Sequence, residues 1–256
     1  MAGALAGTRF LALAVVSGLV VVVGLTIGFM LLPLTAVNKL VLSTLGAAAL
    51  ALGLEAAGVG ANRRAGMALA AAAGVAALWM LQRIVQNMEP AAAWATAIGA
   101  FVLTVSTTGS AIYAGKASPL RAAVVGAGLG WGSGVLAFLG ASALLAQVGL
   151  AVGTASAAVA LVQLLRGRES PLGWTLVLPA AVVAALIGTL ASAGGELRWY
   201  CLIPLPFAPL ATLLVPSGAR RVSWPWAFAA GMAGLLPLAV AVALAAWPLA
   251  TSTPAG

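Results

Sequence analysis

Few side chains in this sequence can do chemistry, and the most informative of them is Glu55. The 256-residue chain contains no histidine, and its four acidic residues are all glutamates. Glu55 is the only one of the four inside a long apolar stretch, residues 40–59. A carboxylate in such a stretch can carry a proton, bind a cation or contact a substrate. It can equally reach the membrane surface or pair with Arg63 or Arg64, and the sequence leaves both interpretations open.

A cluster of hydroxyl groups is the second candidate, in the sequence TVSTTGS at 104–110. On a helix, Thr104 shares a face with Thr107 and Thr108, and Ser106 shares another with Ser110. Such groups can line a polar path for a small solute or bind a cation through their oxygens. They can also bond to a carbonyl of their own helix or join neighbouring helices. The residues predicted for a substrate or ion pathway are Glu55, Thr104, Thr107, Thr108 and Ser110.

Two segments can either pack closely or interrupt a helix. The first is GAGLGWGSG at 126–134, in which Gly126, Gly130 and Gly134 share one helix face. This spacing favours close packing of helices, and the alternative is a helix that unwinds to expose its carbonyls to a substrate. The second is 200–216, in which Pro204, Pro206 and Pro209 oppose a regular helix. That segment is either a broken span or a re-entrant loop.

The inventory of reactive residues argues against an enzyme. Without histidine there is no imidazole base and no imidazole ligand for zinc, copper or haem. The single cysteine, Cys201, cannot form a disulfide within the chain or build a metal site. We therefore expect no catalytic residues, no metal and no cofactor.

Composition identifies the solvent that surrounds these residues. The chain is 63% hydrophobic and only 6% charged, whereas about a quarter of the residues of a soluble domain are charged. The sequence therefore predicts an all-α, polytopic transmembrane helical bundle, with residues 1–256 as a single integral membrane domain. The sequence Ser-Pro-Leu occurs at 118–120 and again at 170–172. This recurrence suggests a two-helix repeat at 117–168 and 169–219.

Intervals without charge outline about nine spans, because about 20 apolar residues cross a bilayer once. The span count falls to eight if 200–216 is re-entrant. The expected spans are 10–32, 40–59, 64–83, 89–116, two within 121–166 that are joined by a turn at 140–149, 169–196, 200–216 and 226–247.

The basic residues favour nine spans. With nine spans, nine of the twelve Lys and Arg residues lie on the side of the N-terminus and three on the other. With eight, the ratio falls to seven against five. Because cytoplasmic loops carry the excess of Lys and Arg, the N-terminus is predicted to be cytoplasmic.

These features suggest a permease, or the membrane subunit of a transport system, for a small solute. The alternative is a non-catalytic accessory subunit packed within a larger membrane protein complex. The expected partners are the lipid bilayer and either other membrane subunits or further copies of the chain. Nucleic acid is not expected, because the basic residues are scattered between apolar runs. Ten arginines against two lysines, with heavy use of Ala and Gly, suggest the cytoplasmic membrane of a GC-rich bacterium.

Overall fold

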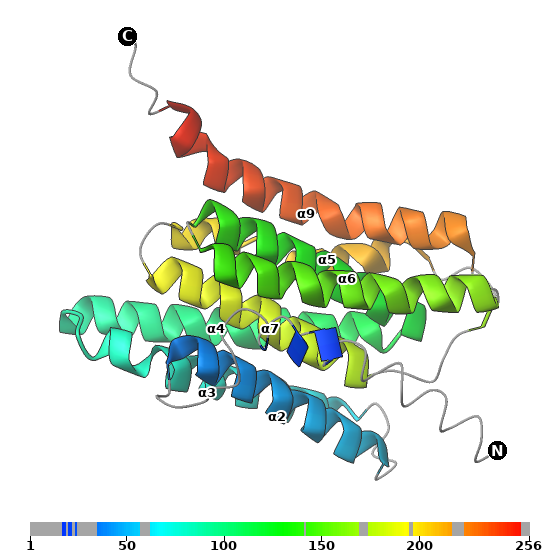
Figure 1. Ribbon diagram of the computed structural model, residues 1–256, viewed down its shortest axis with the longest axis horizontal. Helices are drawn as coiled ribbons and strands as arrows, with labels where there is room; N and C mark the ends of the chain where they lie inside the picture. The colour runs from blue at the N-terminus through cyan, green and yellow to red at the C-terminus, as the bar shows by residue number, and fades with distance from the viewer. Residues whose placement is uncertain are drawn as a thin grey trace.

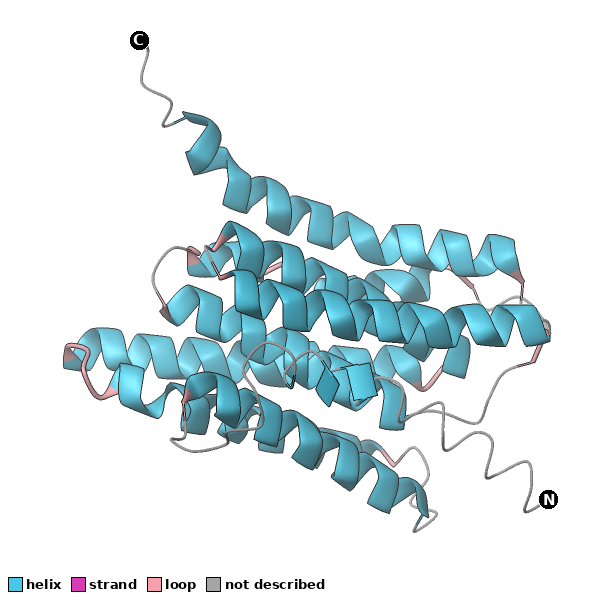
Figure 2. Ribbon diagram, in the orientation of Figure 1, coloured by secondary structure: helices cyan, strands magenta, loops and turns pink. Residues whose placement is uncertain are grey.

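The computed structural model describes residues 17, 18, 20, 21, 24, 35–56, 62–140, 142–168, 174–194, 197–216 and 223–251. The predicted span at 10–32 lies mostly outside these residues. Every regular element in the described part of the chain is helical, which confirms the all-α prediction (Figures 1 and 2). Seven of these helices are long and apolar enough to cross a membrane: α2 (Ala36–Ala56), α3 (Arg63–Val85), α4 (Pro90–Gly115), α5 (Pro119–Leu139), α6 (Ala143–Arg166), α7 (Trp174–Ala193) and α9 (Trp224–Thr251).

Polar residues set several of the helix ends. The side chain of Asn62 accepts a hydrogen bond from the Arg64 nitrogen at the start of α3, and Ser118 does the same for Arg121 at the start of α5. Such side chains satisfy amide groups that have no partner within the helix. Gly167 ends α6 with a φ of 59°, a conformation that glycine adopts without strain.

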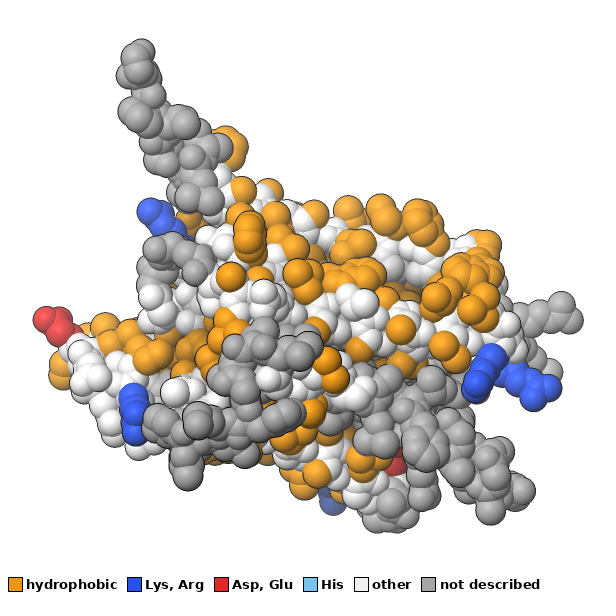
Figure 3. Space-filling model, viewed as in Figure 1, with side chains coloured by type: hydrophobic (Ala, Val, Ile, Leu, Met, Phe, Trp, Pro, Cys, Tyr) orange, Lys and Arg blue, Asp and Glu red, His pale blue; other side chains and the backbone are white. Residues whose placement is uncertain are grey.

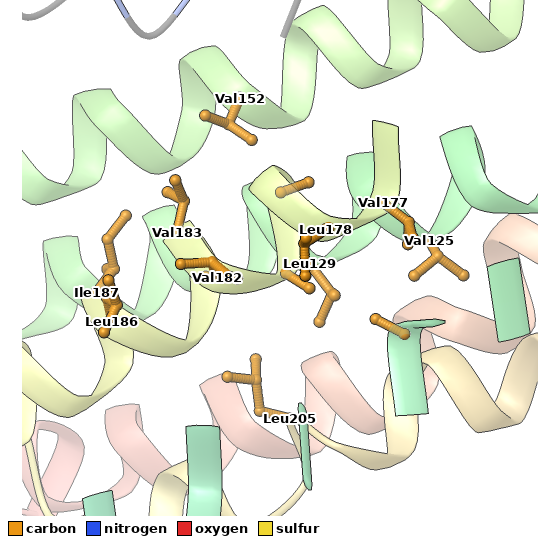
Figure 4. Close-up of a cluster of buried hydrophobic side chains, with 14 of the residues drawn as sticks. Val125, Leu129, Val152, Val177, Leu178, Val182, Val183, Leu186, Ile187 and Leu205 are labelled. Carbon is orange, nitrogen blue, oxygen red and sulfur yellow. The ribbon is translucent and has the colours of Figure 1, made fainter. Parts of the chain in front are cut away.

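Helix α7 is the centre of the bundle. It packs against α2, α4, α5 and α6, and 89% of its most apolar stretch is buried, against 22% for α9. Val177, Val182, Val183 and Ile187 project from it into the core that Figure 4 shows. The inward faces of the outer helices therefore pack against α7, a helix that is almost wholly apolar.

The chain before α9 contains a broken segment, residues 197–216, whose two ends lie near the two ends of α5. It comprises η1 (Trp199–Leu202), α8 (Phe207–Ala211) and η2 (Thr212–Leu214). At one end, a Cβ added to Gly140 would lie 3.3 Å from the Cβ of Leu197. At the other, Nη2 of Arg121 donates a 2.7 Å hydrogen bond to the Val215 carbonyl. The segment thus runs from the last turn of α5 back to its first.

The prolines explain why this segment is not a regular helix. Pro204 and Pro206 have no N–H to donate. The amides of Ile203, Leu205 and Phe207 each bond to the carbonyl three residues earlier. That pattern has a longer rise per residue than an α-helix, roughly 2.0 Å against 1.5 Å, so a short segment can cover the length of α5.

Contacts between helix ends define two ends of the bundle. Helices α3, α5, α7 and α9 begin at one end, where α2, α4 and α6 finish. We name this the basic end, because six described cations lie there, against three at the opposite end. The six are Arg63, Arg64, Lys116, Arg121, Arg166 and Arg168, and the three are Lys39, Arg83 and Arg198.

The surface between the two ends is apolar. On the face shown in Figure 3, hydrophobic side chains cover the middle of the molecule, while charged side chains lie mainly toward its ends. Large apolar side chains such as Trp94, Phe228 and Leu236 are exposed. An exposed apolar band of this kind is what a bilayer requires, and the described helices are those of a multi-pass membrane protein.

Candidate functional site

Three threonines of α4 stand out in the interior. Thr104, Thr107 and Thr108 are each 0% exposed. None of their hydroxyl oxygens has a hydrogen-bond partner in the part of the chain that the structure describes. A buried polar group without a partner costs about 1–3 kcal/mol, so three within five residues of one helix are costly to the fold. We name these residues the threonine cluster.

The contacts of Gly115, later in the same helix, show where the threonine cluster faces. A Cβ added to Gly115 would lie 3.2 Å from Val177 of α7 and 3.4 Å from Ala122 of α5. Thr108 and Thr104 precede Gly115 by seven and eleven residues, which places them on the same face of α4. Thr107 is turned about 100° from Thr108 around the helix. Two of the three hydroxyls therefore lie on the face that α4 turns to α5 and α7.

The cluster lies near the middle of the bundle. Thr104 and Thr108 are roughly 2 Å and 8 Å from the midpoint of α4, at a rise of 1.5 Å per residue. Both lie on the side of the midpoint that leads to the basic end. This half of the bundle is the half that the sequence predicts to be cytoplasmic.

The two serines of the same helix behave differently. Ser106 is exposed, and its hydroxyl donates to the Val102 carbonyl at 2.7 Å. Ser110 is part-buried and donates to the Thr107 carbonyl at 3.0 Å. Both are satisfied by their own helix. Of the predicted pathway residues on α4, Ser110 is thus the one whose hydroxyl is already engaged.

Glu55 makes a different kind of contact. One carboxylate oxygen, Oε1, accepts hydrogen bonds from the backbone nitrogens of Trp174 at 2.8 Å and Thr175 at 3.1 Å. The hydroxyl of Thr175 lies 3.1 Å from the other oxygen, Oε2. These are the first two residues of α7, where the amides lack partners and the helix dipole favours a negative charge. Glu55 therefore caps α7 from another helix.

This position corrects the depth expected for Glu55. The span predicted at 40–59 places it about 8 Å from the middle of that span. The structure has α2 at Ala36–Ala56, so Glu55 lies in the last turn, roughly 13 Å from the helix midpoint. The carboxylate bonds to α7, and no ion pair with Arg63 or Arg64 occurs among the described residues. The nearby cation is Lys116, whose Nζ lies 5.5 Å from the centre of the Trp174 ring.

The structure does not bring Glu55 and the threonine cluster together. Glu55 binds at Thr175, whereas Gly115 meets Val177 and Thr108 lies two turns farther from the basic end. The separation along the bundle axis is roughly 13 Å. The predicted pathway residues thus form two separate sites, a cap at the basic end and a hydroxyl cluster in the interior.

The glycines of α5 lie against α6, and α5 remains helical throughout 119–139. A Cβ on Gly130 would lie 2.5 Å from the Gly153 Cα, and one on Gly134 would lie 2.9 Å from the Leu150 nitrogen. A Cβ on Gly126 would lie 2.8 Å from the Ser156 hydroxyl. At each position the partner helix occupies the space that a side chain would need. The three glycines thus allow the two backbones to approach closely.

The three prolines lie in the broken segment beside α4 and α9. Pro209 is buried, whereas Pro204 and Pro206 are half-buried. The segment that contains them packs through α8 against both α9 and α4, the helix that carries the threonine cluster. The prolines determine the path of the backbone, and no side-chain chemistry is available to them.

Two buried polar residues of α6 lie outside the predicted pathway: Ser156, which the sequence analysis missed, and Gln163, which the sequence suggested to be a solvated polar group. Ser156 is 0% exposed and Gln163 is 1% exposed. The Ser156 hydroxyl and both polar atoms of the Gln163 amide lack hydrogen-bond partners among the described residues. Their spacing of seven residues places them on one helix face, and this is the signal that could have identified them.

No protein family, no curated protein and no solved structure matches this chain.

Proposed function

We propose that this chain is an integral membrane permease, or the membrane subunit of a transport system, for a small solute. The observation that carries the proposal is the threonine cluster, three hydroxyls that are fully buried and make no hydrogen bond to the described residues. Threonine hydroxyls in membrane helices usually bond to their own helix or to a neighbouring one, and these three do neither among the described residues. A solute that passes between α4 and its neighbours would provide the missing partners.

The position of the cluster supports this role. It lies close to the middle of α4, beside the central helix α7 and the broken segment. In transporters, binding sites lie near the midplane and are often formed next to interrupted helices. In this proposal the side chains that contact the solute are those of Thr104, Thr107 and Thr108, while Glu55 holds the start of α7 in place.

Nine crossings with a cytoplasmic N-terminus are part of the proposal. The path of residues 197–216 from the end of α5 back to Arg121 supports a crossing by this segment. The six described cations at the basic end, against three at the other, support a cytoplasmic location for that end. The amino-acid usage supports the cytoplasmic membrane of a bacterium.

Flux measurements test the proposal. Purified protein in liposomes is compared with protein-free liposomes for the passage of glycerol, urea, Na⁺ and Cl⁻, followed by light scattering for the first two and by tracer release for the ions. We expect the protein to accelerate at least one probe. Acceleration of none of them would contradict transport by this chain.

The alternative, an accessory subunit of a larger membrane complex, draws support from α9. Only 22% of its most apolar stretch is buried, and Phe228, Leu236 and Trp247 are among its exposed side chains. Lipid or another membrane subunit can cover such a face. Co-purification of a stoichiometric second subunit, with no flux through the isolated chain, would favour this alternative.

A further inference from the structure

The five Ser and Thr hydroxyls at 104–110 of α4 divide into two classes. Ser106 and Ser110, which are exposed or part-buried, donate to carbonyls of α4 itself. The three members of the threonine cluster are fully buried and make no such bond. Within 104–110 the two serines are therefore satisfied by α4 itself, and the three threonines keep unused hydrogen-bonding capacity.

Three other buried hydroxyls of the bundle bond to their own helices. Thr44 donates to the Leu40 carbonyl at 2.8 Å, and Thr189 donates to the Leu186 carbonyl at 3.0 Å. Ser133 bonds to the Gly130 carbonyl at 3.1 Å. A bond to the preceding turn is available to every Ser and Thr of a helix. All three threonines at 104–108 of α4 lack it, as does Ser156 of α6, so these hydroxyls are free to bond to another partner.

The chemistry of the cluster restricts that partner. Each hydroxyl has one donor and two acceptor sites and carries no charge. The central turns of α4, α5 and α7, and residues 199–214 of the broken segment, contain no Lys, Arg or Glu. Of the buried cations, Lys39 donates to the Trp79 carbonyl and Arg121 donates to the Val215 carbonyl, in each case toward an end of the bundle.

The threonine cluster is poorly suited to bind an ion. A charge that leaves water for an apolar interior loses far more free energy than a neutral polar group does. Buried charges in membranes are therefore paired with opposite charges or with many carbonyl groups. The threonine cluster provides three neutral hydroxyls and no countercharge.

We propose that the threonine cluster binds a small uncharged solute with several hydroxyl or amide groups, of the class of polyols and small carboxamides. Such molecules both donate and accept hydrogen bonds, as the three hydroxyls do. This inference rests on the proposed transport function and specifies its substrate class. The solute exchanges its hydrogen bonds with water for hydrogen bonds with Thr104, Thr107 and Thr108.

The experiment uses the full chain in liposomes, with glycerol and urea as the neutral probes and Na⁺ and Cl⁻ as the ionic probes. The test variant is Thr104→Val, Thr107→Val and Thr108→Val combined, because valine keeps the shape of threonine and removes only the hydroxyl. The triple threonine-to-serine variant restores the hydroxyls. Ser106→Ala is the matched control, since it removes a hydroxyl that faces away from the cluster on the same helix.

We expect glycerol or urea flux in the wild type, its reduction by about tenfold or more in the triple valine variant, and its recovery in the triple serine variant. Ser106→Ala should match the wild type, and thermal unfolding should show that every variant is folded. Ion flux without neutral flux would overturn the substrate class and leave transport standing. Neutral flux that the folded valine variant retains would overturn the site. Absence of flux for all four probes would overturn the proposed function and this inference together.

Discussion

The carboxylate of Glu55 lies 2.8 Å from the backbone nitrogen of Trp174, a residue 119 positions later in the chain. This contact joins the last turn of α2 to the first turn of the central helix. The sequence allows Glu55 to be a proton carrier, whereas in the structure its carboxylate caps the start of α7. A hydrogen bond of this kind depends both on the charge of the carboxylate and on the position of its acceptor oxygen. Substitutions can remove the charge alone or the charge and the acceptor together.

Substitution of Glu55 tests the cap. Glu55→Gln keeps an acceptor oxygen and loses the charge, so we expect a cost of about 1 kcal/mol in the free energy of unfolding. Glu55→Ala removes both, with an expected cost of about 1–2 kcal/mol. The measurement is unfolding in detergent, and flux per folded molecule should be unchanged in Glu55→Gln.

Glu89 provides the control for this prediction. Glu89 is the residue before α4, but its side chain makes no cap hydrogen bond. Glu89→Gln should therefore change the free energy of unfolding by less than about 0.5 kcal/mol. Wild-type stability in Glu55→Ala would contradict the cap. Loss of flux in a fully stable Glu55→Gln protein would instead place the carboxylate in the solute pathway.

The contact of α5 with α6 gives a second prediction. A Cβ at Gly130 would lie 2.5 Å from the Gly153 Cα, and a backbone atom cannot move aside as a flexible side chain can. Gly130→Ala should therefore destabilise the protein by about 1–3 kcal/mol, and Gly130→Leu should also lower the yield of folded protein. Thermal unfolding in detergent measures the first effect and size-exclusion chromatography the second.

Gly99 is the matched position for that experiment, since it lies within α4 and a Cβ there would meet nothing within 4 Å. Gly99→Ala should leave stability unchanged or raise it by up to about 1 kcal/mol, because alanine favours the helix more than glycine does. If both alanine variants were equally stable, close packing at Gly130 would lose its support.

Much of this architecture was predictable from the sequence, because the cost of charge in a bilayer is local. The helices α3 and α4 begin and end within a residue or two of the expected limits, since charged residues flank them. The turn between α5 and α6 falls at the start of the predicted 140–149 window, where Ser142 caps α6.

The candidate site was less predictable, because it depends on which helix faces meet. Periodicity places Thr104 and Thr108 on one face but does not reveal that this face is buried against α7. The partner of Glu55 is more than 100 residues away in the chain, and no local pattern identifies it. Gln163 lies three residues before the end of α6, and only the packed structure shows that it is buried.

The broken segment gives a third prediction, on topology. Because Leu197 meets the end of α5 while Val215 bonds to Arg121 in its first turn, residues 198 and 223 should face opposite sides of the membrane. In a Cys201→Ala background, Arg198→Cys should react with an impermeant thiol reagent from the side that labels Asn87→Cys. Ser223→Cys should react from the side that labels Asn62→Cys.

Labelling of Arg198→Cys and Ser223→Cys from the same side would show that residues 197–216 re-enter and would reduce the span count. Cytoplasmic labelling of Asn87→Cys together with external labelling of Asn62→Cys would instead invert the orientation. These two outcomes are distinct, so the experiment tests the crossing and the orientation separately.

The most direct test of the central claim is whether water and small solutes reach the threonine cluster. Thiols react with a small water-soluble methanethiosulfonate only as thiolates, which form where water is present. We compare Thr108→Cys with Ala137→Cys, a position in α5 that is also 0% exposed but lies in the apolar core, both in the Cys201→Ala background and matched for folded protein. A transport site that opens even in a minor population predicts modification of Thr108→Cys about tenfold faster or more. Equally slow modification of the two cysteines would show that the cluster is sealed core and would contradict the account.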